Sequence, residues 1–290
     1  MTSLNLFKTL NFDLFHWVRL LEKNPTQRKS SATSKHSGGV ALVGAGPGDP
    51  DLMTRKGWKL LISAQVIVYD ALVSQELLDE IPAPIRRIYV GKRKGRHSRS
   101  QQDINQLLVE LAQQGLQVVR LKGGDPLIFG RVTEEIEALK LAGIQWQLVP
   151  GITAAAGCAA QAGFSLTERR IAPSLRLVTA HSCDERPIDW AKLACRDETL
   201  VFYMGLSKVE EISQQLLHHG LPEDWPVLFV EKGTLKDQRQ YLTNLKDMAA
   251  CAQDTGLQAP ALIYVGQVVR QLLTTPQTSR DSLVNQPAPE

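Results

Sequence analysis

The chain has 290 residues, of which 43% are hydrophobic and 22% charged, and its formal net charge is +3. This is the composition of an ordinary globular protein, long enough for one large domain or two smaller ones. The small net charge gives no reason to expect a nucleic-acid partner, and no apolar run approaches the roughly 20 residues of a membrane-spanning helix. Because the cysteines lack Cys-x-x-Cys spacing, we expect buried, reduced thiols in a cytoplasmic protein and no metal site. The cysteines are Cys158, Cys183, Cys195 and Cys251.

Residues 1–38 differ in composition from the rest of the chain. Residues 4–21 carry apolar and aromatic side chains at loosely helical spacing, but no small-residue cleavage site follows, so a secretory signal is not expected. The polar residues 24–38 are typical of a linker. Two interpretations stay open: a flexible extension with a transient helix, or a helix that docks on a partner or on the protein's own surface. Residues 273–290 are polar and contain prolines, which predicts a disordered tail.

From residue 39 to about residue 150, short apolar runs alternate with amphipathic stretches. The runs predict strands and the stretches predict helices, with Ser100 placed to cap the helix that begins at residue 101. This alternation predicts a mostly parallel sheet with helices packed against it. The expected strands are 40–43, 66–69, 88–90, 117–121 and 145–149, and the expected helices are 51–64, 75–81, 101–114 and 133–142.

A helix rich in alanine and glycine, residues 152–162, leads into a second α/β unit. Residues 227–243 leave no room for a full helix between two strands, so we expect a hairpin and a mixed sheet there. The fold class is therefore α/β, with two domains, 39–151 and 152–272, and an active-site cleft between them. The expected strands of the second unit are 175–179, 199–204, 227–230, 240–243 and 261–265, with a helix at 208–219 and others in the first and last gaps.

Two glycine-rich loops each follow a predicted strand. The first reads Val43-Gly44-Ala45-Gly46-Pro47-Gly48-Asp49 and the second Arg120-Leu121-Lys122-Gly123-Gly124-Asp125-Pro126. Open α/β sheets bind their ligands at the ends of such strands. The first loop is not a dinucleotide fingerprint, because Asp49 occupies the place of the third glycine and Pro47 has no backbone N–H. We therefore expect a ligand without phosphates, bound largely through backbone groups.

These loops and several further segments, in this order and spacing, resemble the tetrapyrrole methylases. The resemblance covers residues 39 to about 270, and it is greatest to the members that methylate uroporphyrinogen III. It implies two α/β domains of the tetrapyrrole methylase type. The further segments are Val66-Ile67-Val68-Tyr69-Asp70-Ala71-Leu72-Val73, Gly91-Lys92-Arg93, Phe129-Gly130-Arg131 and Val149-Pro150-Gly151-Ile152-Thr153-Ala154.

The resemblance implies S-adenosylmethionine as methyl donor, bound between the domains, and uroporphyrinogen III as a small-molecule tetrapyrrole substrate. Two added methyl groups would give precorrin-2, which leads to sirohaem or cobalamin. A homodimer is implied, without nucleic acid or membrane. Taken singly, each glycine fits a plain turn and Met204 fits core packing. By position, the family's cofactor contacts fall on Pro47, Gly123, Gly124, Asp125, Ile128, Thr153, Ala154, Met204 and Gly233.

The same resemblance gives a base role to Asp70 and a proton-donor role to Lys92, whereas a plain reading of Asp70 is a helix cap. Arg131 and Glu134 are a rival catalytic pair, and the sequence does not decide between the two pairs. A substrate with eight carboxylates calls for basic side chains, preferably arginine. The positions implied to face the substrate are Arg131, Glu134, Arg169 and His181. A dense basic segment is either part of that surface or a solvated loop; it comprises Arg86, Arg87, Lys92, Arg93, Lys94, Arg96, His97 and Arg99.

Two segments depart from the family pattern. Val132 and Thr133 stand where the family usually has Gly-Gly, so a positive φ there would be strained, although Thr133 can instead cap the following helix. Glu168 stands where a histidine commonly precedes the arginine, and it adds negative charge near a polyanionic substrate. Two alternatives therefore stay open: a methylase of a later corrin precursor, or a non-catalytic sensor or scaffold that binds S-adenosylmethionine.

Bifunctional sirohaem synthases carry a dehydrogenase and chelatase module ahead of this unit. Residues 1–38 are too few to form such a domain. We therefore expect methylation without oxidation or iron insertion.

Overall fold

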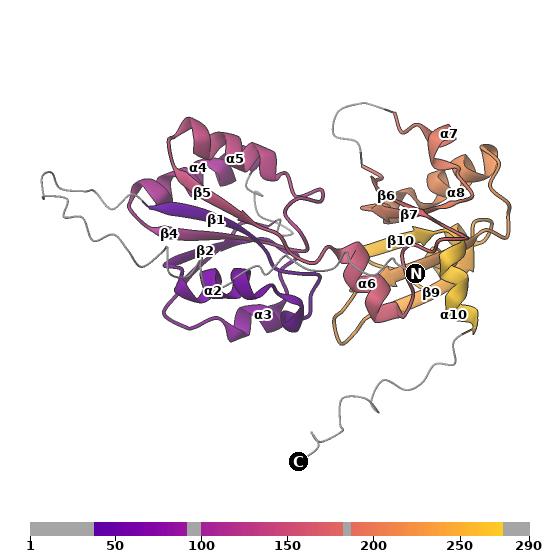
Figure 1. The fold of residues 1–290 in the computed structure, drawn as a ribbon, viewed down its shortest axis with the longest axis horizontal. Coiled ribbons are helices and arrows are strands. Elements are labelled where there is room, and N and C mark those ends of the chain that lie inside the picture. Colours follow the sequence, from indigo (N-terminus) through magenta and orange to yellow (C-terminus); the bar gives the residue numbers. More distant parts are fainter. Residues whose placement is uncertain (1–37, 92–99, 182–186, 275–290) are drawn as a thin grey trace, which may run out of the picture. The chain divides into compact units, whose positions relative to one another are not determined.

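The computed structural model describes residues 38–91, 100–181 and 187–274, which form two five-stranded sheets with helices on both faces of each (Figure 1). The expectation of two α/β units, the first built on a parallel sheet, is confirmed. The domain boundaries and the cleft between the domains stay predictions.

The first sheet is parallel throughout, in the order β3-β2-β4-β1-β5. Its strands β1 and β2 are nearly continuous apolar runs because helices cover both faces, whereas the middle strand β4 also carries Arg120 and Lys122. The chain returns from β3 to place β4 between β2 and β1, so the loops after β1 and β4 leave the same edge side by side. The strands are β1 (Gly39–Gly44), β2 (Val66–Tyr69), β3 (Arg86–Tyr89), β4 (Gln117–Lys122) and β5 (Gln145–Val149).

Two helices cover each face of this sheet. One core lies under α2 and α3, and a second lies under α4 and α5 (Figure 1). Ser100 caps α4 in a reciprocal capping box with Asp103, as expected. The helix expected from residue 51 begins only at Arg55, because the Thr54 hydroxyl accepts a bond from the Gly57 N–H (3.1 Å). The helices are η1 (Pro50–Leu52), α2 (Arg55–Ser63), α3 (Gln75–Glu80), α4 (Gln101–Gln113) and α5 (Val132–Leu141).

The second sheet is mixed, in the order β6-β7-β10-β8-β9. Only β6 and β7 run parallel, and β8 and β9 form the predicted hairpin. Its strands are β6 (Ser174–Thr179), β7 (Glu198–Tyr203), β8 (Pro226–Glu231), β9 (Arg239–Asn244) and β10 (Ala261–Val265).

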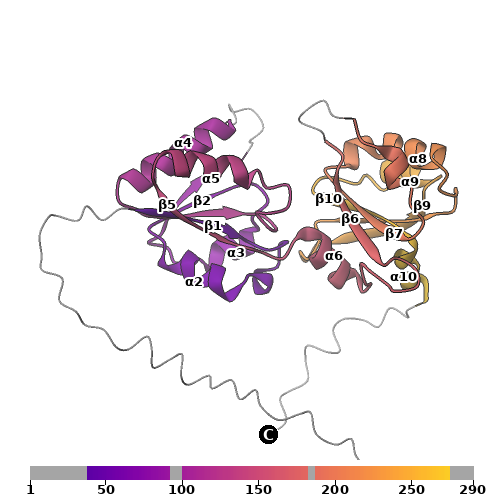
Figure 2. The same ribbon diagram turned by 45° about the horizontal axis from the view of Figure 1, so that its top comes forward.

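Helices also cover both faces of the second sheet (Figure 2). Phe202 and Phe229 pack under α7, α8 and α9, whereas Tyr264 packs under α6 on the other face. Burying each such ring contributes about 1.5–3 kcal/mol. The helix expected from residue 152 begins at Ala154. These helices are α6 (Ala154–Ala162), α7 (Trp190–Leu193), η2 (Leu206–Lys208), α8 (Val209–His218), α9 (Met248–Asp254), η3 (Gln267–Arg270) and α10 (Gln271–Thr274).

Some sequence expectations concern thiols and chain ends. Cys158 is buried as expected, but Cys195 and Cys251 are only partly buried. Cys183 lies outside the described residues, as do the extension before Gly38 and the tail after α10. Within the described ranges, no helix has the length and apolar character needed to cross a membrane.

Candidate active site

Three loops of the first sheet meet in backbone contact where β1, β4 and β5 end. Gly46 and Gly124 exchange two backbone hydrogen bonds, with N···O distances of 3.2 and 2.7 Å. A Cβ on Gly44 would lie 2.5 Å from the Gly151 nitrogen, and a Cβ on Gly151 would lie 2.2 Å from the Gly124 oxygen. Only glycine allows this approach. The glycine motifs therefore hold three loops together at the edge where parallel sheets bind ligands.

The loop after β4 carries the predicted contacts Gly123, Gly124, Asp125 and Ile128. A Cβ on Gly123 would lie 2.4 Å from Leu72 Cβ, so this glycine lets the loop pack against the loop after β2. The Asp125 carboxylate accepts a bond from the Leu127 N–H through Oδ1 (2.9 Å), and the Asp125 carbonyl accepts from the Ile128 N–H (3.1 Å). Asp125 is thus fixed, half-buried, on the rim of the loop.

The loop after β1 contacts elements of the second sheet. A Cβ on Gly157 of α6 would lie 2.4 Å from Pro47 Cγ, and the Asp49 N–H donates to Thr234 Oγ1 (3.1 Å). Asp49 also caps the short helix η1 through its side chain. Pro47 therefore rests on α6, close to two further predicted contacts, Thr153 and Ala154, at the start of that helix.

Gly233 lies in the loop after β8, which packs so closely on α6 that no side chain fits at this position. A Cβ at this position would lie 2.0 Å from the Cys158 Sγ. The loop therefore packs directly on α6, and a side chain at residue 233 would displace it.

Tyr203, which the sequence reasoning did not single out, ties the end of β7 to the start of α6. Its hydroxyl is 2.6 Å from Thr153 Oγ1 and accepts from the Ala155 N–H (2.9 Å), while its ring lies 5.0 Å from that of Phe129. Burial raises the pKa of Tyr203, which keeps the phenol neutral. Met204 follows with 50% of its surface exposed, so the core-packing reading of this residue is wrong.

Backbone strain gathers around these loops. Among the described residues, the non-glycine positions with positive φ are Phe129 (51°), Arg131 (53°), Met204 (54°), Lys232 (49°) and Thr234 (67°). Each such conformation costs on the order of 1 kcal/mol, and such residues cluster at functional sites. All five flank or belong to positions that the sequence assigns to the site.

Asp70 stands at the end of β2, as expected. Its Oδ1 accepts from the Leu72 N–H (3.1 Å), and its Oδ2 accepts from Arg120 Nη2 (3.2 Å). The helix-cap reading is wrong, because Ser74 caps α3. One quarter of the Asp70 side chain (25%) is exposed, so this carboxylate is paired with Arg120 and still partly accessible to solvent.

Behind Asp70 lies a buried charge cluster that sequence reasoning missed. Glu135 of α5, 0% exposed, accepts from Arg120 Nε (3.0 Å) and from Lys122 Nζ (2.9 and 3.0 Å). Burial, followed by the charge of Arg120, lowers the pKa of Lys122, while Glu135 opposes that shift. The signal in the sequence was the pair Arg120 and Lys122, two basic residues on one face of a buried strand, which require a buried acid.

Arg131 and Glu134 form a bidentate ion pair, with Nε–Oε1 and Nη2–Oε2 distances of 2.7 Å. Arg131 is the N-cap residue of α5, so the expectation that Thr133 caps this helix is wrong. Val132 and Thr133 lie within the helix and the positive φ falls on Arg131. The Gly-Gly departure therefore introduces no backbone strain at residues 132 and 133.

The remaining predicted residues are not joined to these loops. Arg169 lies on an exposed turn closed by bonds between Glu168 and Ala172, and His181 is exposed after β6. Among the described residues, no hydrogen bond links either side chain to the loops above. The Glu168 carboxylate accepts from Gln271 Nε2 (2.8 Å).

Much of the basic segment falls outside the described residues, including Lys92, Arg93, Lys94, Arg96, His97 and Arg99. Arg86 and Arg87 lie on β3, where Arg87 Nη2 donates to the Ile81 carbonyl (2.7 Å). That contact gives Arg87 a structural role at the edge of the sheet.

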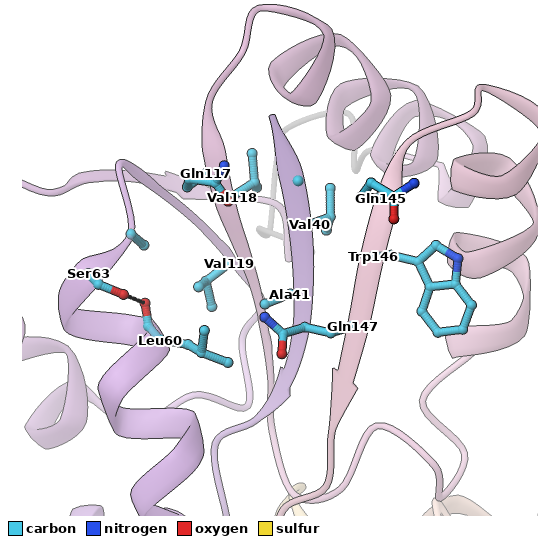
Figure 3. A pocket seen from close by; sticks show the side chains of 12 residues that line it. Val40, Ala41, Leu60, Ser63, Gln117, Val118, Val119, Gln145, Trp146 and Gln147 are labelled. Atoms are coloured by element: carbon cyan, nitrogen blue, oxygen red, sulfur yellow. Dashed lines mark hydrogen bonds between the residues drawn. The ribbon is translucent and has the colours of Figure 1, made fainter. Parts of the chain in front are cut away.

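A cavity of about 250 Å³ lies at the opposite end of the first sheet (Figure 3). Gly39, Gln117 and Gln145, the first residues of β1, β4 and β5, line it. Figure 3 shows Gln147 and Trp146 on opposite sides of β5. Of the predicted site residues that the structure describes, none lines this cavity.

The chain matches the family model for tetrapyrrole (corrin/porphyrin) methylases over residues 39–249. It is 51% identical over 232 residues to siroheme synthase 2 of Yersinia enterocolitica, covering 80% of this chain and 49% of that protein. The chain thus spans about half the length of the curated relatives it matches.

Solved structures of similar proteins agree with the family match. The native uroporphyrin-III C-methyltransferase of Thermus thermophilus has a TM-score of 0.70 at 37% identity, covering 81% of this chain and 100% of that chain. The same protein complexed with S-adenyl homocysteine gives the same values. A cobalt precorrin-4 methyltransferase has a TM-score of 0.73 at 28% identity, covering 82% of this chain and 98% of that chain. This chain belongs to the tetrapyrrole methylase family.

Proposed function

We propose that this chain is an S-adenosylmethionine-dependent C-methyltransferase that adds two methyl groups to uroporphyrinogen III and yields precorrin-2. One observation carries the proposal: the chain is 37% identical to a solved uroporphyrin-III C-methyltransferase that it covers completely. The convergence of three glycine loops at one sheet edge supports it, because open α/β sheets bind their ligands at such edges.

The residues at this edge fit S-adenosylmethionine. The ligand is cationic at its ammonium and sulfonium groups, and Asp125 offers a fixed carboxylate on the loop rim. Its adenosine needs an apolar wall, and Met204 and Leu127 are exposed by 50% and 56%. Backbone groups of the loops around Gly124 and Thr153 complete the set of residues that would hold it. Binding of S-adenyl homocysteine by the similar Thermus thermophilus protein supports this assignment.

The bound cofactor supplies an electrophilic methyl group, so the protein's own part is alignment and proton removal. We assign proton removal from the methylated ring to Asp70, whose carboxylate is held by two hydrogen bonds and is one quarter (25%) exposed. Lys92 would donate a proton as the resemblance implies. Arg131, held in a defined orientation by Glu134, would pair with a substrate carboxylate through its planar fork. Arg169 and His181 would contribute further substrate contacts.

A second candidate is methylation of a later corrin precursor. The likeness to a cobalt precorrin-4 methyltransferase favours it as an alternative, at a lower identity of 28%. The two candidates differ in the number of methyl groups transferred, since the first requires two per macrocycle.

We propose that the chain works as a cytoplasmic homodimer and that its product feeds sirohaem or cobalamin synthesis. Oxidation and iron insertion would fall to other polypeptide segments or proteins. Sedimentation of the purified chain and fractionation of the cells that make it would test the assembly and the compartment.

Transfer of isotopically labelled methyl tests the activity. The chain is incubated without oxygen with methyl-labelled S-adenosylmethionine and either uroporphyrinogen III or a later corrin precursor. The proposal expects label in the tetrapyrrole fraction with uroporphyrinogen III. Label only with the later precursor would favour the second candidate. Tight binding of S-adenosylhomocysteine without any transfer would favour the sensor or scaffold.

A further inference from the structure

The side chain of Glu135 is hydrogen-bonded to residues on two neighbouring elements of the candidate site. It lies on the buried face of α5, one turn after Arg131, and its side chain is fully buried. Its carboxylate accepts from Arg120 and Lys122 of β4 and from Gln101 Nε2 of α4 (3.3 Å). Two elements, β4 and α4, therefore donate to one carboxylate of α5, and the end of β2 is connected to it through Arg120.

Arg120 forms the connection between Glu135 and Asp70. Its Nε donates to Glu135 (3.0 Å) and its Nη2 donates to Asp70 (3.2 Å), while Nη1 donates to the Leu121 carbonyl (2.8 Å). A guanidinium is planar and rigid, so fixing one of its donors fixes the direction of the others. Arg120 thus holds one oxygen of the Asp70 carboxylate, and Glu135 together with the Leu121 carbonyl holds the guanidinium plane of Arg120.

We propose that Glu135 is a positioning residue for methyl transfer, acting through Arg120 on Asp70. The proposal rests on the function given above and deepens it, because it assigns a role to a buried acid that does not reach the ligand edge. Lys122 serves the same arrangement by holding both oxygens of Glu135. The cluster contains two cations and two carboxylates, so each charge is matched within it.

Glu135→Gln tests the proposal, because it keeps the side-chain shape and removes the charge. Misorientation of a catalytic group commonly lowers turnover by roughly tenfold to a hundredfold. We expect a kcat loss in that range with the KM for S-adenosylmethionine changed less than about twofold, because the cofactor loops are untouched. An unchanged kcat in a folded Glu135→Gln protein would overturn the proposal.

A double-mutant cycle distinguishes positioning from general structural damage. If Glu135 acts through Asp70, Glu135→Gln lowers kcat in the wild type but adds little in an Asp70→Asn background. Effects that multiply in the double variant would show that Glu135 acts independently of Asp70, and would also overturn the proposal. If the wild type transfers no methyl group, the proposed function is wrong, and the positioning role that rests on it falls with it. If Asp70→Asn keeps full kcat, the base assignment fails instead.

Two further variants provide a control and a replacement for Glu135→Gln. Glu198→Gln breaks a more exposed ion pair with Arg176 (2.8 Å) at the start of β7, away from the loops, and should keep the wild-type kcat. If Glu135→Gln does not fold, Arg120→Lys takes its place. Lysine keeps the charge but cannot hold two carboxylates in the geometry of the fork. The same kcat loss is expected, and a wild-type kcat in Arg120→Lys would contradict the proposal.

Discussion

Two aspartates at strand ends are held differently, and the difference separates their proposed roles. Asp70 is paired with the buried guanidinium of Arg120, whereas the Oδ1 of Asp125 accepts from a backbone amide on the loop rim. A carboxylate that already faces a guanidinium attracts a ligand cation less strongly than one that does not. Asp125 therefore suits the cationic part of the cofactor, and Asp70 suits proton removal.

Substitution of each aspartate should separate binding from turnover. Asp125→Ala removes a charge-assisted contact, so S-adenosylhomocysteine should bind about tenfold more weakly or worse. Asp70→Ala should lower kcat at least about tenfold and leave that affinity within about twofold. Calorimetry measures the affinity and an initial-rate assay the turnover. Affinity lost in Asp70→Ala but kept in Asp125→Ala would reverse the assignment.

The packing of Gly233 on Cys158 predicts a specific rescue. Gly233→Ala places a Cβ 2.0 Å from the Cys158 Sγ, so we expect a loss of about 1–3 kcal/mol in the free energy of unfolding. Adding Cys158→Ala removes the sulfur and should restore part of that loss. Gly39→Ala is the control, because its nearest contacts would be at 3.4 Å. Denaturant titration checks all four proteins, and equal stability of the single and double variants would contradict this packing account.

The sequence alone identifies the glycines, Asp70 and Asp125 as candidate site residues, because strand ends and glycine spacing are local signals. The sequence does not identify Glu135, since the pairing of Glu135 with Arg120 depends on which face of α5 covers β4. Tyr203 could not be identified for a similar reason, because its bond to Thr153 joins β7 to the start of α6 across 50 positions of the sequence.

At the scale of elements, the start of α5 shows how a departure from the family pattern is accommodated. Val132 is 8% exposed and packs in the core shared with α4, and Arg131 takes the positive φ. The family's glycines at these positions would remove apolar contact and add backbone freedom in the unfolded chain. Val132 and Thr133 thus stabilise the helix that carries Glu134 and Glu135.

Restoring Gly-Gly at residues 132 and 133 should therefore destabilise the protein. The lost methyl groups and the added backbone entropy together cost about 2–3 kcal/mol in the free energy of unfolding. Turnover at a temperature where both proteins are folded should not rise. Chemical denaturation and initial rates provide the measurement, with Thr133→Gly alone as a milder control. A restored protein that is both stable and faster would show that the departure impairs catalysis.

The elements themselves were largely predictable because their signals are local. β2 and β5 match their predicted ranges, 66–69 and 145–149, residue for residue. The predicted start of α2 was wrong because this segment contains two N-cap residues. Asp49 caps the short helix η1, and Thr54 caps the longer helix α2. The strand order of either sheet was not predictable, since it depends on long-range pairing that no local pattern specifies.

For the whole molecule, stability should fall at alkaline pH. Burial raises the pKa of Cys158 from 9.0 to about 11 and also raises the pKa values of Tyr203 and Tyr264. The unfolded chain then loses these protons at lower pH than the folded one. Stability from such groups is complete below their unfolded pKa values and is lost as the pH rises through the folded values. Lys122, with a lowered pKa, acts in the opposite direction.

Cys158→Ala isolates one of these contributions. Between pH 9 and pH 11 the wild type should lose roughly 2 kcal/mol more stability than the variant, in proportion to the shift of the thiol pKa. Denaturant titrations under reducing conditions at both pH values give the difference. Parallel losses in the two proteins would show that the thiol does not titrate with folding.

The central claim is that this chain places two methyl groups on one tetrapyrrole. Mass spectrometry of the product, after anaerobic incubation with excess S-adenosylmethionine and enzymatically generated uroporphyrinogen III, measures this most directly. We expect a macrocycle that carries two added methyl groups. A product that stops at one methyl group, or an unmodified substrate beside a protein that binds S-adenosylhomocysteine, would contradict it.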